Sequence, residues 1–130
     1  MKSTTITELT QEQITEGTRL IAEYSTGLKP IHVIYLVGQD KCQINMPDNK
    51  VDVNFYHRSL SDLNPVWSKL VDEMSGCFDK TDYAVKNSMR RHRNEYIGCI
   101  HDNDIPGAFL VVSSCIAMMN KGREVGRIHT

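Results

Sequence analysis

Residues 51–74 read VDVNFYHRSLSDLNPVWSKLVDEM, and this stretch contains two different hydrophobic periods. In its first part Val51, Val53 and Phe55 alternate with other residues, which is the pattern of a strand with one buried face. In its second part apolar residues recur at helical spacing: Leu60, Leu63, Trp67, Leu70, Val71 and Met74. The stretch therefore predicts a strand followed by an amphipathic helix.

The segments before this stretch extend the sheet and add a helix. Residues 41–45 precede a polar turn, and with residues 51–56 they predict a hairpin. Residues 31–37 are β-branched and aromatic, which predicts another strand, covered on both faces. Thr10 and Gln13 have the spacing of a capping box, so a helix is expected from there to Gly27.

The pattern weakens after residue 77 and recovers near residue 105. Residues 83–85 and 96–100 favour two short strands, and the polar residues between them indicate a loop. Pro106 then begins an apolar helix that is expected to reach about Asn120. The order helix, strands, helix, strands, helix indicates an α+β fold. In it a small, mostly antiparallel sheet is packed by about three helices.

Length and composition bound the kind of protein. The chain has 130 residues, of which 40% are hydrophobic and 24% are charged, and its formal net charge is −1. These values predict one globular domain over residues 1–130, with frayed ends at 1–8 and 122–130, and argue against a polyanion-binding surface over the whole molecule. The chain shows neither an apolar leader nor a long uninterrupted apolar run, which predicts a cytoplasmic protein without a membrane partner.

Two phrases resemble a known family. Residues 14–24, ITEGTRLIAEY, resemble the G-x-x-L-I-A-E-[FY] opening of the phage ABA-sandwich domain family. Residues 56–70, YHRSLSDLNPVWSKL, are similar to its Y-H-x-S-x-x-x-L-x-P-V-x-x-K-I segment, with Leu60 where an aromatic residue is usual. The helix expected at 105–120 is also similar to the last helix of that family and of NinX-like phage proteins. The resemblance implies an α-β-α layered sandwich, a phage or prophage origin and a bacterial cytoplasm, but no particular activity.

One basic cluster is the main candidate binding site. It comprises Lys86, Arg90, Arg91, His92 and Arg93, with Tyr83 and Tyr96 on either side. No acidic residue lies between Tyr83 and Asn94. On a loop, Arg90, Arg91 and Arg93 could gather around one phosphate or carboxylate, and the tyrosines could stack on bases. The alternative is a solvated polar loop with no ligand.

His57 and Arg58 offer a second anion-binding position. They stand where the predicted strand meets the predicted helix, and helix N-termini favour anions. They could form a second wall beside the basic cluster. The alternative is that Ser59 or Ser61 caps the helix while His57 and Arg58 remain solvated.

No pattern predicts a catalytic residue, a metal ligand set or a cofactor. Cys42, Cys77, Cys99 and Cys115 are too scattered for a zinc site and are expected to be mostly buried thiols. The turn at 101–104, HDND, contains potential ligands, but it is more typical of a polar turn that caps the next helix.

Three functions remain open from the sequence. The first is a non-enzymatic accessory protein of a phage or mobile element that binds a host protein or a small phosphorylated ligand such as a nucleotide. The second is a nucleic-acid-binding module that uses residues 86–93, and the third is a small hydrolase of a nucleotide or phosphoester. The oligomeric state, including a homo-oligomer, is left open.

Overall fold

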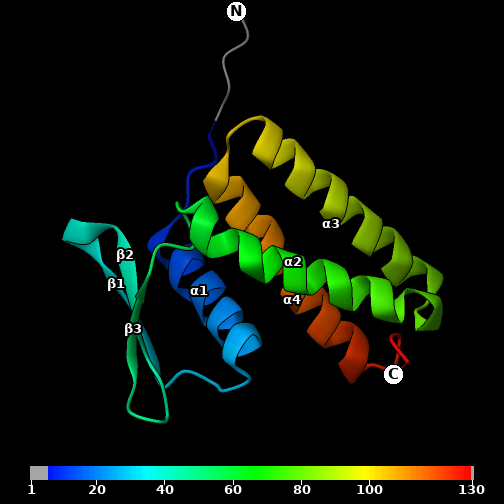
Figure 1. Ribbon diagram of the computed structural model, residues 1–130, viewed down its shortest axis with the longest axis horizontal. Helices are drawn as coiled ribbons and strands as arrows, with labels where there is room; N and C mark the ends of the chain where they lie inside the picture. The colour runs from blue at the N-terminus through cyan, green and yellow to red at the C-terminus, as the bar shows by residue number, and fades with distance from the viewer. Residues whose placement is uncertain (1–5, 130) are drawn as a thin grey trace, which may run out of the picture.

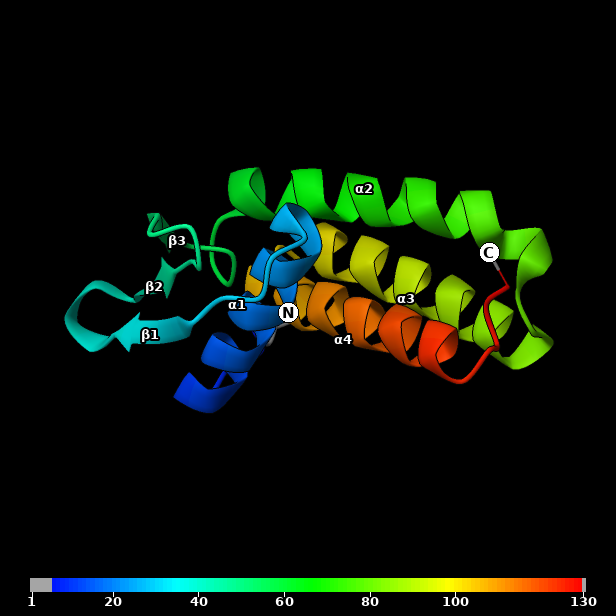
Figure 2. The ribbon, with the colours of Figure 1, turned by 90° about the horizontal axis from the view of Figure 1, so that it is seen from below.

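The computed structural model describes residues 6–129. In chain order its helices and strands are α1 (Gln11–Thr26), β1 (His32–Leu36), β2 (Lys41–Asn45), β3 (Val51–Asn54), α2 (Leu60–Cys77), α3 (Tyr83–His101) and α4 (Ile105–Glu124). The helices pack together, and the sheet lies beside α1 at one side of them (Figure 1 and Figure 2). The predicted α+β class with a small antiparallel sheet is confirmed. Four helices form instead of about three, and the expected α-β-α layering is wrong, because among residues 6–129 helices cover one face of the sheet only.

The first helix begins and ends where the sequence predicts. The Gln13 N–H donates to the Thr10 hydroxyl (3.1 Å), and the Thr10 N–H donates to the Gln13 side chain (2.9 Å), which completes the capping box. Gly27 ends the helix with φ of 76°, a conformation that glycine adopts without strain. Ile14 and Ile21 are buried, so the predicted apolar face is confirmed.

The sheet has the order β1-β2-β3 with antiparallel pairing, as the predicted hairpin requires. One face carries buried Cys42 and Ile44 and packs on α1. The other face carries Ile34, Val51 and Val53, which are exposed. The prediction that residues 31–37 are covered on both faces is therefore wrong, as is the predicted burial of Val51 and Val53. The register pairs Ile34 and Val53 with Gln43, on the face turned away from α1.

The helix α2 confirms the stripe that decided the fold. Leu63, Trp67, Leu70 and Met74 are buried, and the Trp67 ring stacks on Tyr96 with centroids 4.1 Å apart. Of the two predicted caps, the structure uses Ser59. Its hydroxyl accepts a hydrogen bond from the Asp62 N–H at 3.4 Å.

The prediction for residues 77–100 is wrong, because α3 occupies Tyr83–His101 and neither short strand forms. Val85, Met89, His92 and Tyr96 recur at helical spacing and are the buried residues of α3. That face packs against α4, and burial on one helical face outweighs the strand propensity of the short β-branched and aromatic runs.

The helix α4 is the centre of the core. It packs on α1, α2 and α3, and its residues Phe109, Val112, Cys115, Ile116 and Met119 are buried. By length and composition alone it could cross a membrane, but 56% of its most apolar window is buried inside this fold. Its apolar character is thus accounted for by packing against three other helices.

Both ends of the described chain are attached to the helices. Ile128 is buried and forms a bridge with Thr81, so residues 122–129 are docked rather than frayed. At the other end the Thr7 N–H and hydroxyl donate to the two carboxylate oxygens of Asp104, at 3.0 and 2.6 Å. Residues 1–5 and 130 lie outside the described residues.

Asp104 joins the N-terminal segment to α4. Its carboxylate also accepts a hydrogen bond from the Gly107 N–H (3.1 Å), which makes it the cap of that helix, as the sequence predicts. Burial by itself raises the pKa of Asp104, but the hydrogen bonds from Thr7 and Gly107 outweigh it and hold the pKa below its ordinary value of 3.8. The folded state therefore favours the ionised form.

This arrangement predicts an acid-dependent loss of stability. Because the folded pKa lies below the unfolded one, the contribution of Asp104 is full above the ordinary value of 3.8 and disappears as pH falls through the folded pKa. We expect Asp104→Asn to be less stable than the parent at neutral pH, by about 1 kcal/mol, with the difference shrinking on acidification. Urea unfolding of both proteins at about pH 6 and about pH 3 measures this. A difference that is independent of pH would contradict it.

Candidate functional site

The helix α3 divides the predicted basic cluster between different faces. Lys86, Arg90 and Arg93 follow i, i+4, i+7 spacing and share one side of the helix. Arg91 is on another side, where its Nε lies 4.0 Å from Glu95 Oε1. The expected loop that gathers Arg90, Arg91 and Arg93 is therefore wrong, since consecutive residues of a helix point in different directions.

Two of the aligned cations, Arg90 and Arg93, line a hollow between α2 and α3, and Lys86 lies next to it over the Phe78 ring. The hollow has a volume of about 290 Å³, and its lining comprises Met74, Ser75, Phe78, Met89, Arg90 and Arg93. Lys86 Nζ and Arg90 Cζ each lie 5.0 Å from the centroid of the Phe78 ring, which is the geometry of cation–π contacts. We call this set of residues, with Lys86, the basic groove.

The charge of the basic groove is not balanced locally. Among residues 6–129, no carboxylate forms an ion pair with Lys86, Arg90 or Arg93, whereas Arg91 has Glu95. The Arg90 side chain donates from Nη1 to Oδ1 of neutral Asn87 at 3.2 Å. Three cations beside the half-buried Phe78 ring make a site for a ligand with both anionic and apolar parts.

Two other predicted site residues belong to the core. His92 is buried, and its Nδ1 donates to the Ser88 carbonyl at 2.7 Å. Tyr96 is buried against Trp67, its hydroxyl donates to Asn64 Oδ1 at 3.1 Å, and burial raises its pKa. Neither can reach a ligand. Tyr83, by contrast, is 75% exposed at the start of α3.

His57 and Arg58 already have an anion, the carboxylate of Asp40. His57 Nε2 lies 2.8 Å from Asp40 Oδ1, which also accepts from the Tyr35 hydroxyl at 2.6 Å. Arg58 Nε lies 3.4 Å from Asp40 Oδ2 and donates to the Asp40 carbonyl at 2.9 Å. Burial alone raises the pKa of Asp40, but the hydrogen bonds from Tyr35 and His57 and the charges of His57 and Arg58 hold it below its ordinary value.

This pair also lies far from the basic groove. His57 and Arg58 precede α2, while Phe78 follows its last residue. A helix of 18 residues is about 27 Å long at 1.5 Å per residue, so the two positions are at opposite ends of it. His57 and Arg58 therefore do not form a second wall. His57 is buried as well, which corrects the alternative that both are solvated.

Three of the four cysteines are buried in the fold, and the turn at 101–104 provides the cap of α4. Cys42, Cys77 and Cys115 are buried, and burial raises the pKa of Cys115 to about 12, so that thiol stays protonated. In the part of the chain that the structure describes, no three histidine, cysteine or acidic side chains come together as a metal site. Asp104 caps α4, as described above.

The chain was compared with protein-family models, curated proteins and solved structures. None of them matches it. The resemblance to the phage ABA-sandwich family therefore stays a prediction, and the function has to be argued from the residues of the basic groove.

The sequence predicts the cations of the basic groove but not the residues that face them from α2 and the turn after it. Met74 and Phe78 come from the end of α2 and the turn after it, and nothing local in the sequence pairs them with Arg90. A usable signal was present, since Lys86, Arg90 and Arg93 are spaced for a helix, like Val85, Met89, His92 and Tyr96.

Proposed function

We propose that the protein acts without catalysis, by binding a small phosphorylated ligand of the nucleotide class in the basic groove. The observation that carries this is the row of Lys86, Arg90 and Arg93 beside Phe78, which has no ion-pair partner among residues 6–129. We further propose, on the resemblance of residues 14–24 and 56–70, that it serves a phage or prophage as an accessory protein in the host cytoplasm.

The geometry suits one phosphate group and an adjoining ring. Arg90 and Arg93 are one turn apart on the same helix face, so their guanidinium groups can donate to different oxygens of a single phosphate. Lys86 adds a third charge one turn earlier. Half-buried Phe78 offers apolar surface against which the base of a nucleotide can pack, and the buried Met74 and Met89 lie beneath it.

The other functions from the sequence have less support in this groove. Hydrolysis needs a general base, and the described residues that line it include no histidine or carboxylate. Nucleic-acid binding needs an extended basic and aromatic surface, whereas Arg91 is paired and Tyr96 is buried. A host protein with a phosphorylated or acidic segment would meet the same three cations, so it is an outcome of the test below.

The test compares two matched arginine variants. Arg90→Gln/Arg93→Gln removes two groove charges, and Arg91→Gln removes a charge from the same helix outside the groove. We expect the parent to bind ADP by calorimetry, with affinity that falls as salt rises, and the double variant to lose at least about tenfold, because each charge-assisted hydrogen bond contributes about 1.5–3 kcal/mol. Arg91→Gln should bind like the parent.

Three results would reject the proposal. One is no binding of ADP or pyrophosphate by a folded parent. Another is equal loss in Arg91→Gln. The third is affinity for single-stranded DNA that greatly exceeds that for ADP and depends on Arg91, which would favour the nucleic-acid function instead. Binding of an acidic peptide but neither phosphate probe would favour a host protein as the ligand.

A further inference from the structure

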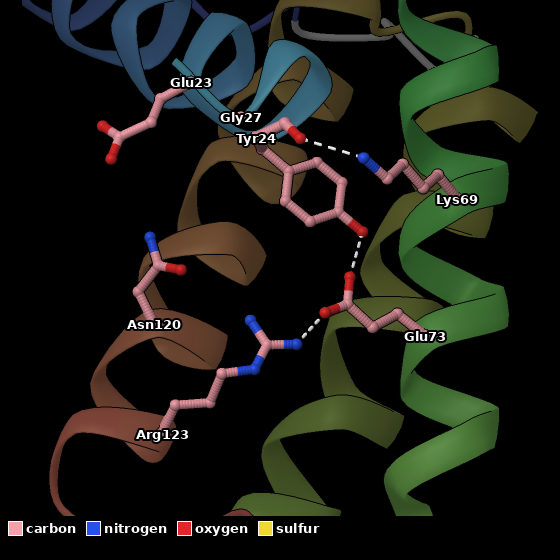
Figure 3. A pocket seen from close by; sticks show the side chains of 7 residues that line it. All are labelled: Glu23, Tyr24, Gly27, Lys69, Glu73, Asn120 and Arg123. Carbon is pink, nitrogen blue, oxygen red and sulfur yellow. Dashed lines mark hydrogen bonds and ion pairs between the residues drawn. The ribbon is translucent and has the colours of Figure 1, made fainter. Parts of the chain in front are cut away.

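A second hollow lies on the other side of α2, where the end of α1, the middle of α2 and the last turns of α4 meet. Its volume is about 590 Å³, within the range of small-molecule sites. Figure 3 shows Glu23 and Asn120 on one side, Lys69 and Glu73 on the other, and the Arg123 guanidinium between them. It shares no lining residue with the basic groove.

One side of this hollow is held in place by a polar network. Glu73 accepts hydrogen bonds from the Tyr24 hydroxyl through one carboxylate oxygen and from Arg123 through the other. Burial raises the pKa of Tyr24, although the charge of Arg123 lowers it in part, so the hydroxyl stays protonated as a donor. Lys69 Nζ donates to the Tyr24 carbonyl at 3.0 Å and lies 4.5 Å from the centre of its ring.

The network leaves donors directed at the hollow. A guanidinium has five N–H groups, and within residues 6–129 Arg123 donates through Nη2 alone. Lys69 has three ammonium hydrogens, and one is used by the Tyr24 carbonyl. These two cations therefore retain N–H groups that can donate to a ligand carboxylate.

The opposite side supplies an acceptor that is not engaged. Within residues 6–129, neither the Glu23 carboxylate nor the Asn120 amide forms a side-chain hydrogen bond or ion pair. Both residues line the hollow, and Figure 3 shows the Glu23 carboxylate at its outer edge. Glu73 is neutralised by Arg123, so Glu23 is the carboxylate left to attract a positive group.

The hollow thus has available donors on one side and an available carboxylate on the other. A simple anion could bind Lys69 and Arg123 but would leave Glu23 without a partner, and a simple cation could bind Glu23 but would be repelled by Lys69 and Arg123. A ligand that carries both a negative and a positive group can bind the cations with the first and Glu23 with the second. We propose that this hollow binds a small zwitterion of the amino-acid class, with its carboxylate on Arg123 and Lys69 and its ammonium group on Glu23.

The experiment uses two zwitterions and their half-molecules. Glycine and 4-aminobutyrate differ in the distance between their charges, while acetate and ethylammonium each carry one of the charges. We expect at least one zwitterion to raise the melting temperature in a saturable manner and to give binding heat, and neither half-molecule to do so at equal concentration.

The variants Glu23→Gln and Lys69→Met each remove one proposed contact and leave the Glu73–Arg123 pair intact. Both should weaken zwitterion binding by at least about tenfold, because a charge-assisted hydrogen bond is lost. Glu16→Gln is the matched control, since Glu16 is on the same helix and pairs with Arg19 at 3.8 Å outside the hollow. It should bind like the parent.

Several outcomes would overturn the inference. These are no binding of either zwitterion up to about 10 mM, equal binding of acetate alone, or unchanged binding in Glu23→Gln. Because the variants leave Arg90 and Arg93 in place, ADP binding serves as a separate readout. Loss of ADP binding in the arginine variants, with zwitterion binding intact, would separate the two sites.

Discussion

Trp67→Ala should lower the free energy of unfolding by about 3–5 kcal/mol, the range for removing a large aromatic side chain from a core. Trp67 is 8% exposed, and its ring stacks on Tyr96 at an interplanar angle of 17°. The change leaves a cavity between α2 and α3, and it removes the stacking partner of a tyrosine that is itself buried. Both effects lower the stability of the folded state.

Denaturant unfolding monitored by circular dichroism measures this change. Trp67→Phe is the matched control, because it keeps an aromatic ring beside Tyr96 and should cost much less. Tyr96→Phe removes only the hydrogen bond to Asn64 and should cost about 1 kcal/mol. A loss below about 1 kcal/mol for Trp67→Ala would show that Trp67 is not a core residue.

The elements that the sequence predicts well are those whose signals are local. Thr10 with Gln13 marks the start of α1, and Leu63, Trp67, Leu70 and Met74 repeat at helical spacing within α2. Such signals require no knowledge of what packs against the helix. The cap at Asp104 and the apolar content of α4 belong to the same class.

The helix α3 was missed because its signals are weak and partly polar. Two of its four buried positions are His92 and Tyr96, which look polar in a hydrophobicity pattern. Asp82 at its N-cap makes no side-chain capping hydrogen bond. The burial of His92 depends on tertiary packing, and so does the exposure of Val51 and Val53 on the far face of the sheet.

The candidate sites, too, depend on tertiary packing that local sequence patterns do not reveal. Lys86, Arg90 and Arg93 are close in sequence, so the sequence alone shows them as a basic cluster. Only the helical geometry of α3 shows that Arg91 points away from the basic groove. The second hollow joins Glu23, Glu73 and Arg123 from three distant segments. No spacing rule within one segment can bring these residues together, because they meet only when α1, α2 and α4 pack.

Gly17 on α1 gives the sharpest test of how α1 packs on α4. Gly17 is buried, and a Cβ at this position would lie 2.6 Å from Cε2 of Phe109 and closer still to Cζ. Phe109 has no exposed surface, and its ring also packs edge-on against His57 at 6.2 Å between centroids. The ring therefore has little room to move away from an added methyl group.

Gly17→Ala is expected to destabilise the protein by about 1–3 kcal/mol, the usual range for overpacking a core. The sign of the change in unfolding free energy is informative. Alanine is a better helix former than glycine, so the same substitution stabilises a helix by up to about 1 kcal/mol where there is space for the methyl group. Gly98→Ala is the matched control. No atom of the described residues that could obstruct a Cβ there lies within 4 Å of it, so this change should stabilise the protein by roughly 0.5–1 kcal/mol. Chemical denaturation of both variants gives the two signs.

A double-mutant cycle then identifies the residue responsible. Phe109→Leu alone should destabilise the protein, since it removes part of a buried ring. In that background Gly17→Ala should be much less harmful than in the parent, because the atoms that the new methyl group meets are absent. If Gly17→Ala is neutral or stabilising in the parent, or equally harmful in both backgrounds, α1 and α4 do not pack through a Gly17–Phe109 contact.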